Sequence, residues 1–319
     1  MEHIYIASHT EDGGIYHYTL GDGRLSFGDK TDVSLPMYMA VSGGRLYVIT
    51  ERLEDGNSGI MSYKIGEDGA LSDMSEAVST DGRVSCHLTV RDGRVYNANY
   101  SSGSVNLLGY KTVVHSGHGI NRERQEMPHV HYTGFTPDGK YLLACDLGLD
   151  TVFIYDAELR EICRTWVPDG HGIRHLAFSD DGATMYGINE LTGTVTVWDY
   201  DGRSGSFTRL STVAALPADF TGVNTSAAIR VSGDRLYVSH RGHDSITVLD
   251  ISERIPKIIK WVGVHGRGPR DFDIFGNTLI STNEGTGGAA VFSMNGDDFT
   301  FVEEHSCPAA LCVVGIELP

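Results

Sequence analysis

Short apolar stretches alternate with turns rich in glycine and aspartate along the whole chain. One apolar residue closes the first stretch of each unit and recurs at intervals of 39 to 53 residues. After it come a turn that contains glycine in six of the seven units, a second apolar stretch, a polar loop and a third, alternating stretch. Aromatic and β-branched residues between such turns are typical of β-strands. The seven recurring residues are Val41, Val90, Phe135, Phe178, Val231, Ile274 and Val313.

This period indicates a β-propeller, because each unit has the length and the strand content of one propeller blade. Several units also contain a fourth predicted strand, at Ala70–Ala77, Phe207–Val213 and Phe299–Glu304. No long amphipathic helix interrupts the pattern. We therefore predict an all-β fold, a seven-bladed β-propeller of four-stranded antiparallel blades that forms a single domain over residues 1–319.

The last unit is split between the two ends of the chain. Its first strand is predicted at Pro308–Leu318, and its other three strands at Ile4–Ser8, Gly14–Leu20 and Leu25–Lys30. Pairing of the terminal strands would close the ring and leave no open sheet edge.

Charge and composition exclude several classes of partner. The formal net charge is −17, from 42 acidic and 25 basic residues, which argues against nucleic acid or an anionic membrane as partner. The sequence shows neither an apolar run long enough for a membrane helix nor a signal peptide, so a cytoplasmic location is expected. The five cysteines lack CxxC spacing and are read as reduced core thiols.

Polar residues gather at one predicted end of the blades. In an antiparallel blade, the start of the first strand and the end of the second strand lie at the same end. The predicted channel mouth therefore collects two groups of residues. Four positions before each recurring apolar residue stand Met37, Cys86, His131, Arg174, Ala227, Arg270 and Ala309. The ends of the second strands supply Glu51, Asn189, Glu190, His240, Arg241 and Glu284, among others.

A long polar run, His115 to Asp150, brings Arg122, Arg124 and His129 to the same mouth. Arginine suits carboxylate and phosphate groups because its planar fork donates two hydrogen bonds at once. Glutamate and histidine are candidate acids or bases. In a chain of this net charge, an anionic substrate would depend on such a local cationic cluster.

Structural roles compete with functional ones at this mouth. Arg174 with Glu190, and Arg270 with Glu284, are also placed to form plain ion pairs between strands of one blade. Asn189 and Asn283 suit turn capping as well as ligand binding.

The remaining histidines favour structural interpretations. Alternation along a strand predicts that His175 points away from the side of Arg174, as a hydrogen-bonded core histidine. His115 and His118 are expected to be solvated loop residues. A zinc site would need three or four convergent ligands, and no such set stands out, so we predict no metal.

At these residues the sequence resembles the lactonase family of seven-bladed propellers, which includes the propeller-type 6-phosphogluconolactonases. The run RQ…PHVH…PDGKYLL…DLGLD is the most specific match, and GIRHLAFSDDG, SHRGHD and GRGPRDFDIFGN extend it. The sequence is also similar to the fungal carboxy-muconate lactonizing enzyme. That resemblance implies a catalytic set of His131, Arg174, Glu190 and Arg241.

Two positions depart from the family pattern. Ile173 replaces a usual proline, and His240 replaces a usual asparagine. Because His240 is next to Arg241, it could alter the choice of substrate.

The resemblance implies hydrolysis of a sugar-acid lactone, with 6-phospho-D-glucono-1,5-lactone of the pentose phosphate pathway as the expected substrate. Glu190 or His131 would be the base, and Arg174 would stabilise the oxyanion. Arg124, Arg241 and Arg270 would hold the phosphate. No cofactor is implied. The further candidates for substrate binding are His129 and Asn189. Two alternatives remain open, a cycloisomerase acting on a small dicarboxylate and a non-enzymatic binding propeller.

Overall fold

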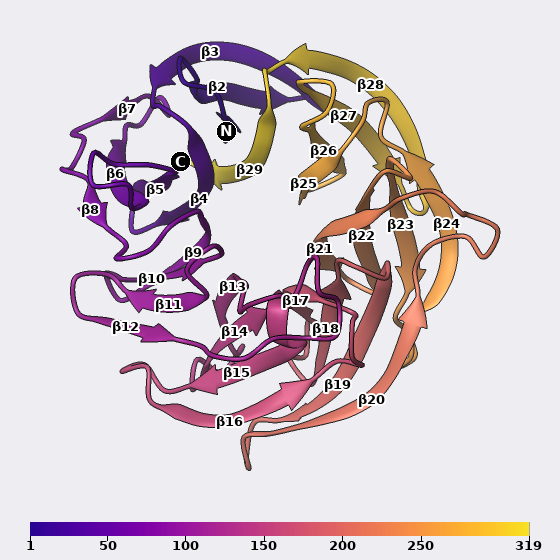
Figure 1. Ribbon diagram of the computed structural model, residues 1–319. Coiled ribbons are helices and arrows are strands. Elements are labelled where there is room, and N and C mark those ends of the chain that lie inside the picture. Colours follow the sequence, from indigo (N-terminus) through magenta and orange to yellow (C-terminus); the bar gives the residue numbers. More distant parts are fainter. Residues whose placement is uncertain (319) are drawn as a thin grey trace.

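Seven antiparallel sheets surround a central channel in the computed structural model (Figure 1), which describes residues 1–318. Each sheet is one blade, and its first strand lines the channel. Six blades have four strands, and the blade that begins with β4 has a fourth strand divided into two pieces. A single 3-10 turn, η1 (Leu147–Leu149), is the only helical element among the described residues. The predicted seven-bladed, all-β fold is confirmed.

The strands follow the chain from one blade to the next. The closing blade contains β29 (Ala310–Glu317), β1 (Glu2–Ser8), β2 (Gly14–Gly21) and β3 (Arg24–Asp32). The next three blades contain β4 (Pro36–Ser42), β5 (Arg45–Thr50), β6 (Gly59–Ile65), β7 (Leu71–Ser72) and β8 (Val78–Ser79); β9 (Ser85–Arg91), β10 (Arg94–Asn99), β11 (Ser104–Leu107) and β12 (Lys111–Val114); and β13 (Val130–Phe135), β14 (Leu142–Asp146), β15 (Thr151–Tyr155) and β16 (Glu161–Trp166). The last three contain β17 (Ile173–Phe178), β18 (Thr184–Asn189), β19 (Thr194–Asp201) and β20 (Ser206–Ala214); β21 (Thr225–Ser232), β22 (Arg235–Arg241), β23 (Ser245–Asp250) and β24 (Lys257–Gly263); and β25 (Pro269–Phe275), β26 (Thr278–Asn283), β27 (Gly288–Asn295) and β28 (Asp298–Ser306).

The two ends of the chain close the ring as predicted. β29 pairs with β1 from Glu2↔Glu317 to Ser8↔Ala310, so the C-terminal strand provides the innermost position of the blade that the N-terminus completes (Figure 1). The Ser8 hydroxyl also donates a hydrogen bond of 2.6 Å to the Pro308 carbonyl. This pairing leaves no unpaired sheet edge at the junction.

The predicted fourth strand at Ala70–Ala77 is wrong. Two-residue strands, β7 and β8, replace it and pair with opposite ends of β6. The chain turns between them at Asp73, which has a φ of 47°, a conformation that does not continue a strand. Arg45 fixes this turn with hydrogen bonds to both the carboxylate and the carbonyl of Asp73.

Apolar faces of neighbouring blades pack against each other and form the core. Between the β13–β16 and β17–β20 blades, for example, Leu143, Ile154, Met185 and Trp198 are fully buried. The Trp198 indole N–H donates to Thr165 across this interface at 2.9 Å. Such packing fixes the inner strands rigidly around the channel, which is what a precise site requires.

Every inner strand has a β-bulge at the same place, near the end where the second strand finishes. A bulge opposes two residues to one on the partner strand and redirects side chains. In six blades it falls at the position predicted for the channel mouth. In the closing blade the extra residue is Leu311 rather than the predicted Ala309, because the recurring apolar residue there is two positions out of phase with the other blades. The residues at the bulges are Leu311, Met37, Cys86, His131, Arg174, Ala227 and Arg270.

Candidate active site

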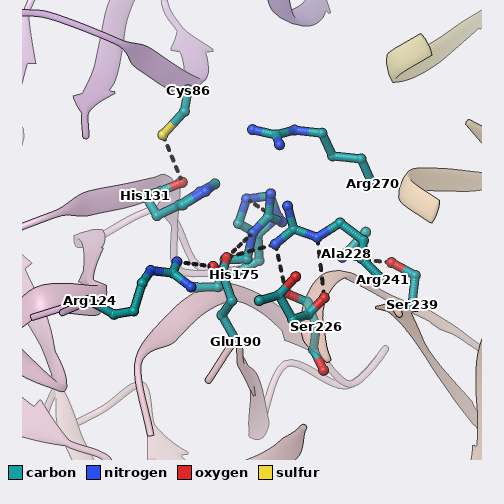
Figure 2. Close-up of polar contacts among 12 residues, drawn as sticks. Cys86, Arg124, His131, His175, Glu190, Ser226, Ala228, Ser239, Arg241 and Arg270 are labelled. Carbon is teal, nitrogen blue, oxygen red and sulfur yellow. Dashed lines mark hydrogen bonds and ion pairs between the residues drawn. The ribbon is translucent and has the colours of Figure 1, made fainter. Parts of the chain in front are cut away.

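Three arginines converge on the carboxylate of Glu190 at the channel mouth. Figure 2 labels two of them, Arg124 and Arg241, beside Glu190. Arg124 Nη2 lies 2.5 Å from Oε1, and Arg174 Nε and Arg241 Nη2 each lie 3.0 Å from Oε2. The Glu190 side chain is only 5% exposed. Sequence reasoning expected these residues at one mouth, and the structure brings them into direct contact. Arg174 and Glu190 thus also form the ion pair between strands of one blade that the structural interpretation expected.

Local backbone structure fixes each member of this cluster. Glu190 directly follows β18, and its N–H donates to the Gly172 carbonyl at 2.7 Å while its carbonyl accepts from Ser226 N–H at 3.0 Å. These two bonds tie Glu190 to the start of its own blade and to the next one. Arg174 sits at the bulge of β17, and Arg241 ends β22, where its Nε–H donates to the Thr225 carbonyl at 3.2 Å.

The cluster is electrostatically tight. Burial raises the pKa of Glu190, but Arg241, Arg174 and the other nearby cationic groups lower it by more, so its pKa lies well below the ordinary value. Burial, reinforced by Arg241, lowers the pKa of Arg174 to about 9, which still leaves the guanidinium charged at neutral pH. Glu190 is thus an ionised carboxylate held among arginines.

His131 stands at the neighbouring bulge and contributes an uncharged imidazole. It is 5% exposed, and its buried Nδ1 has no hydrogen-bond partner among residues 1–318. Burial first, and then Arg174, lower the pKa of His131 well below its ordinary value. The ring packs edge-on against Tyr100 and His175, with centroids 5.6 and 5.2 Å away. At neutral pH this ring is a free base within the cationic cluster.

Arg270 lies across the mouth from Glu190 (Figure 2). It pairs with Glu284 at 3.3 Å, as the ion-pair interpretation expected, and its side chain is 21% exposed. Four guanidinium groups, from Arg124, Arg174, Arg241 and Arg270, therefore face two carboxylates, while Glu51, the third carboxylate predicted at this mouth, pairs with His9 at 2.7 Å. The mouth carries an excess of positive charge in a chain whose formal net charge is −17.

Two candidate residues do not join the cluster. The Asn189 side chain turns into its blade and donates to Thr194 and Thr196, both at 2.9 Å, because successive strand residues point to opposite faces. His129 stacks on Tyr100 with centroids 4.3 Å apart and lies 3.2 Å from Glu126. Both ring nitrogens of His129 have partners, and the Asn189 amide nitrogen is bound within its own blade.

His240 occupies the same position in its blade as Asn189. It is fully buried, with Nδ1 2.7 Å from Ser226 Oγ and Nε2 2.9 Å from Thr247 Oγ1. Its side chain therefore faces the blade interior, and the idea that it alters substrate choice from beside Arg241 is not supported by its position.

His175 is buried and hydrogen-bonded, as predicted for a core histidine, but the prediction that it points away from the side of Arg174 is wrong. It contacts Arg174, with Nε2 3.4 Å from Nη1, and both residues line one small cavity in the channel. The reason is the bulge, which breaks the alternation that the prediction assumed.

The loop between β12 and β13 carries Arg124 and is clamped by Asp146, a residue that the sequence analysis did not single out. One carboxylate oxygen of Asp146 lies 2.6 Å from His115 Nδ1 at the start of the loop. The other accepts the His129 N–H at 2.8 Å at its end. His115 also reaches the Tyr155 hydroxyl and is buried. The expectation that it is a solvated residue is therefore wrong.

Gln125 fixes the tip of the same loop. It is fully buried, its Nε2 donates to the Leu147 carbonyl at 2.9 Å, and its Oε1 accepts from Asn121 N–H at 3.1 Å. Asp146 and Gln125 thereby hold the neighbouring Arg124 against Glu190. The sequence does contain a signal for this arrangement. Gln125 in the RQ pair and Asp146 in the DLG run are polar residues at a loop tip and at a strand end, where neither position requires a polar side chain.

No group of three or more metal-ligating side chains is close enough to hold a metal ion in residues 1–318. The cysteines form no disulfide, and four of them are buried while Cys163 is exposed. Over the same residues no helix has the length and apolar character that a membrane span needs.

Comparisons with known proteins agree with this architecture. The family model described as a seven-bladed β-propeller lactonase matches residues 3–314. The 6-phosphogluconolactonase of Bacillus subtilis is 32% identical, and the match covers 90% of each chain. A crystal structure from Lactobacillus plantarum is 31% identical with a TM-score of 0.92, covering 99% of each chain. The periplasmic gluconolactonase of Pseudomonas aeruginosa is 25% identical with a TM-score of 0.89, covering 100% of this chain and 99% of that one.

Proposed function

The chain belongs to the lactonase family of seven-bladed β-propellers, and we propose that it hydrolyses a sugar-acid lactone, with 6-phospho-D-glucono-1,5-lactone as its substrate. The family and the named relatives support the reaction class. Our proposal for the site is the cluster of His131, Arg174, Glu190 and Arg241. The cytoplasmic location stays a prediction from the sequence.

The excess of arginine at the mouth is the observation that carries the proposal of a phosphorylated substrate. The chain as a whole repels anions, yet four guanidinium groups face two carboxylates there. Arg124 and Arg270 are the most exposed of the four, at 36% and 21%. A phosphate group has the charge and the geometry that these forked donors recognise.

The deeper residues fit the chemistry of ring opening. A water molecule attacks the lactone carbonyl carbon, and the His131 imidazole accepts its proton. The carbonyl oxygen becomes an oxyanion beside the guanidinium groups of Arg174 and Arg241, which stabilise the developing charge. The ring C–O bond then breaks, and the leaving ring oxygen takes the proton from His131 to give the open hydroxy acid.

His131 is the better base because Glu190 is already occupied. Both oxygens of Glu190 face arginines, and its lowered pKa makes it a weak proton acceptor. The role of Glu190 in this scheme is to orient the arginines and limit their mutual repulsion. Arg174 also lowers the pKa of His131, so a bound anion that offsets this positive charge would strengthen the base.

A comparison of substrates tests the proposal. Hydrolysis of 6-phosphogluconolactone, unphosphorylated gluconolactone and muconolactone should be followed with the purified protein, above the spontaneous rate of each. We expect the highest kcat/KM for the phosphorylated lactone and a smaller advantage as ionic strength rises, because salt screens an incompletely buried site. A preference for muconolactone would favour the cycloisomerase alternative. Turnover of none of the three would favour the binding propeller.

A further inference from the structure

A large cavity lies at the opposite end of the channel from Glu190. Its volume is about 690 Å³, within the range of small-molecule sites. The C-terminal halves of the inner strands β9, β13, β17 and β21 line it, together with the turn from Thr136 to Gly139 that joins β13 to β14. We call it the lower cavity. Since that turn is at the far end of its hairpin from the bulges, the cavity opens on the other face of the propeller.

A layer of side chains separates this cavity from the candidate active site. The ring centroids of Tyr38 and His87 lie 4.3 Å apart, those of His87 and Tyr132 4.5 Å, and those of Tyr132 and His175 5.6 Å. The ion pair of Arg230 with Asp271, at 2.8 Å, continues the layer. Its members come from six of the seven inner strands, so a ligand in the lower cavity would not reach Glu190.

The layer presents unused hydrogen-bonding atoms to the cavity. Among residues 1–318, the hydroxyls of Tyr38 and Tyr132, the Nε2 of His87 and the Nδ1 of His175 have no partner. Both imidazoles are more than nine-tenths buried, at 6% and 4% exposure. Tyr38 and Tyr132 are half-buried. All four residues line the one cavity, so a small molecule that enters it could bond to several of these unpaired atoms at once, and we take their convergence as the mark of a binding site.

The charges around the cavity are already paired. Arg230 faces Asp271 and Asp273, and its Nη1 donates to the Ile229 carbonyl. Asp138 receives hydrogen bonds from Thr136 and Tyr200 and lies 3.3 Å from the Lys140 ammonium. Arg91 contacts Asp92 and the Gly139 carbonyl. No charged group is left over to attract an ion, in contrast to the arginine-rich mouth.

The two histidines add hydrogen-bonding capacity without charge. Burial lowers the pKa of His87 and of His175 well below the ordinary value, and nearby arginines lower both further. In each neutral ring one nitrogen already accepts a hydrogen bond, His87 Nδ1 from the Thr133 N–H and His175 Nε2 from Arg174, so the other nitrogen carries the proton and is a donor. The apolar side chains of Val90, Phe135, Phe178 and Val231 surround the cavity further out, where they can cover the carbon faces of a small ring.

We propose that this cavity is a second binding site, separate from the active site, and that it takes an uncharged, hydroxyl-rich small molecule such as a sugar or cyclic polyol. The proposal does not depend on lactone hydrolysis, because none of the residues that carry it belongs to the Glu190 cluster.

The experiment measures binding of D-glucose and myo-inositol as neutral probes, with glucose 6-phosphate as the anionic probe, by ligand-observed NMR and calorimetry on the full chain. Wild type is compared with Tyr132→Phe, which removes one hydroxyl, and with Thr89→Phe, which fills part of the cavity. Arg241→Gln is the control at the opposite mouth, and thermal melting checks that each variant is folded.

We expect saturable binding of a neutral probe, weakened about threefold to tenfold by Tyr132→Phe, as for the loss of one neutral hydrogen bond. Thr89→Phe should abolish binding, and Arg241→Gln should leave it unchanged. The proposal is overturned if neither neutral probe binds at concentrations up to about 50 mM, where even Kd values of tens of millimolar would be seen. It is also overturned if the folded cavity variants bind like wild type, if Arg241→Gln removes binding, or if glucose 6-phosphate is the tighter ligand of the lower cavity.

Discussion

His131 and Glu190 are rival candidates for the residue that takes the proton from water. The ring of His131 has an unpartnered Nδ1, whereas both oxygens of Glu190 face arginines. We expect His131→Asn to lower kcat by about 10²- to 10⁴-fold and to leave the melting temperature nearly unchanged, since the change breaks no side-chain hydrogen bond. Steady-state kinetics and calorimetry on the same preparation measure both effects. Wild-type turnover in a folded His131→Asn protein would exclude this base.

Glu190→Gln should behave differently, because it removes the counter-charge of three arginines. Breaking a buried ion pair by removing one partner costs about 3–5 kcal/mol, so this variant should be clearly less stable as well as less active. Denaturant unfolding measures the loss. An equally stable Glu190→Gln protein would show that the arginines do not depend on the carboxylate.

For single residues, the sequence predicted the location correctly where the position within a blade determines which end of the channel a residue occupies. Arg174, Glu190 and Arg241 could be placed at one mouth because inner-strand starts and second-strand ends coincide in every blade. His175 was misplaced because a bulge leaves no clear mark in a single sequence. Asn189 and His129 were overvalued, since their partners, Thr196 and Tyr100 among them, become neighbours only through folding.

Among the elements, the loop that carries Arg124 depends on Asp146 at both of its ends. Asp146→Asn should loosen the loop and raise KM for an anionic lactone by about tenfold with a smaller change in kcat, because weakening one charge-assisted hydrogen bond costs about 1.5–3 kcal/mol. Steady-state kinetics separates the two parameters.

Thr50→Val is the matched control for the loop. Thr50 also ends a second strand and donates to the Ser34 carbonyl at 2.8 Å, but no long loop depends on it. It should lower stability without changing KM. An unchanged KM in Asp146→Asn, or an equal rise in Thr50→Val, would contradict a specific role for the clamp.

The elements were largely predictable because strand and turn residues alternate with a period that recurs seven times. The predicted Phe207–Val213 and Phe299–Glu304 lie within β20 and β28. Ala70–Ala77 failed because Asp73 adopts a positive φ that Arg45 stabilises from another strand, a contact that local sequence does not reveal.

At the scale of the whole molecule, several buried histidines make stability depend on pH. Burial is the main cause that lowers the pKa values of His87, His131, His175 and His240, the last to about 3. Below the ordinary value of about 6.5, the unfolded chain therefore binds protons that the native protein does not. As the pH is lowered through this range, the free energy of unfolding should decrease by about 1.4 kcal/mol per pH unit for each histidine.

Denaturant unfolding between pH 8 and pH 5 measures this slope. His240→Asn is the matched variant, because Asn99, Asn189 and Asn283 hold the same position in three other blades. It should reduce the slope by the contribution of one histidine. A free energy of unfolding that is flat from pH 7 to pH 5, or a slope that His240→Asn does not change, would contradict the assignment of neutral buried histidines.

The central claim is that the arginine cluster around Glu190 performs the hydrolysis of a phosphorylated lactone. Turnover of 6-phosphogluconolactone by wild type and Arg174→Lys, above the spontaneous rate, tests it most directly, with Arg164→Lys on the exposed strand β16 as the control for the exchange. A lysine cannot reproduce the planar fork of arginine. We predict that Arg174→Lys lowers kcat about 10²- to 10³-fold while Arg164→Lys retains wild-type activity. Wild-type turnover by a folded Arg174→Lys protein would contradict the claim.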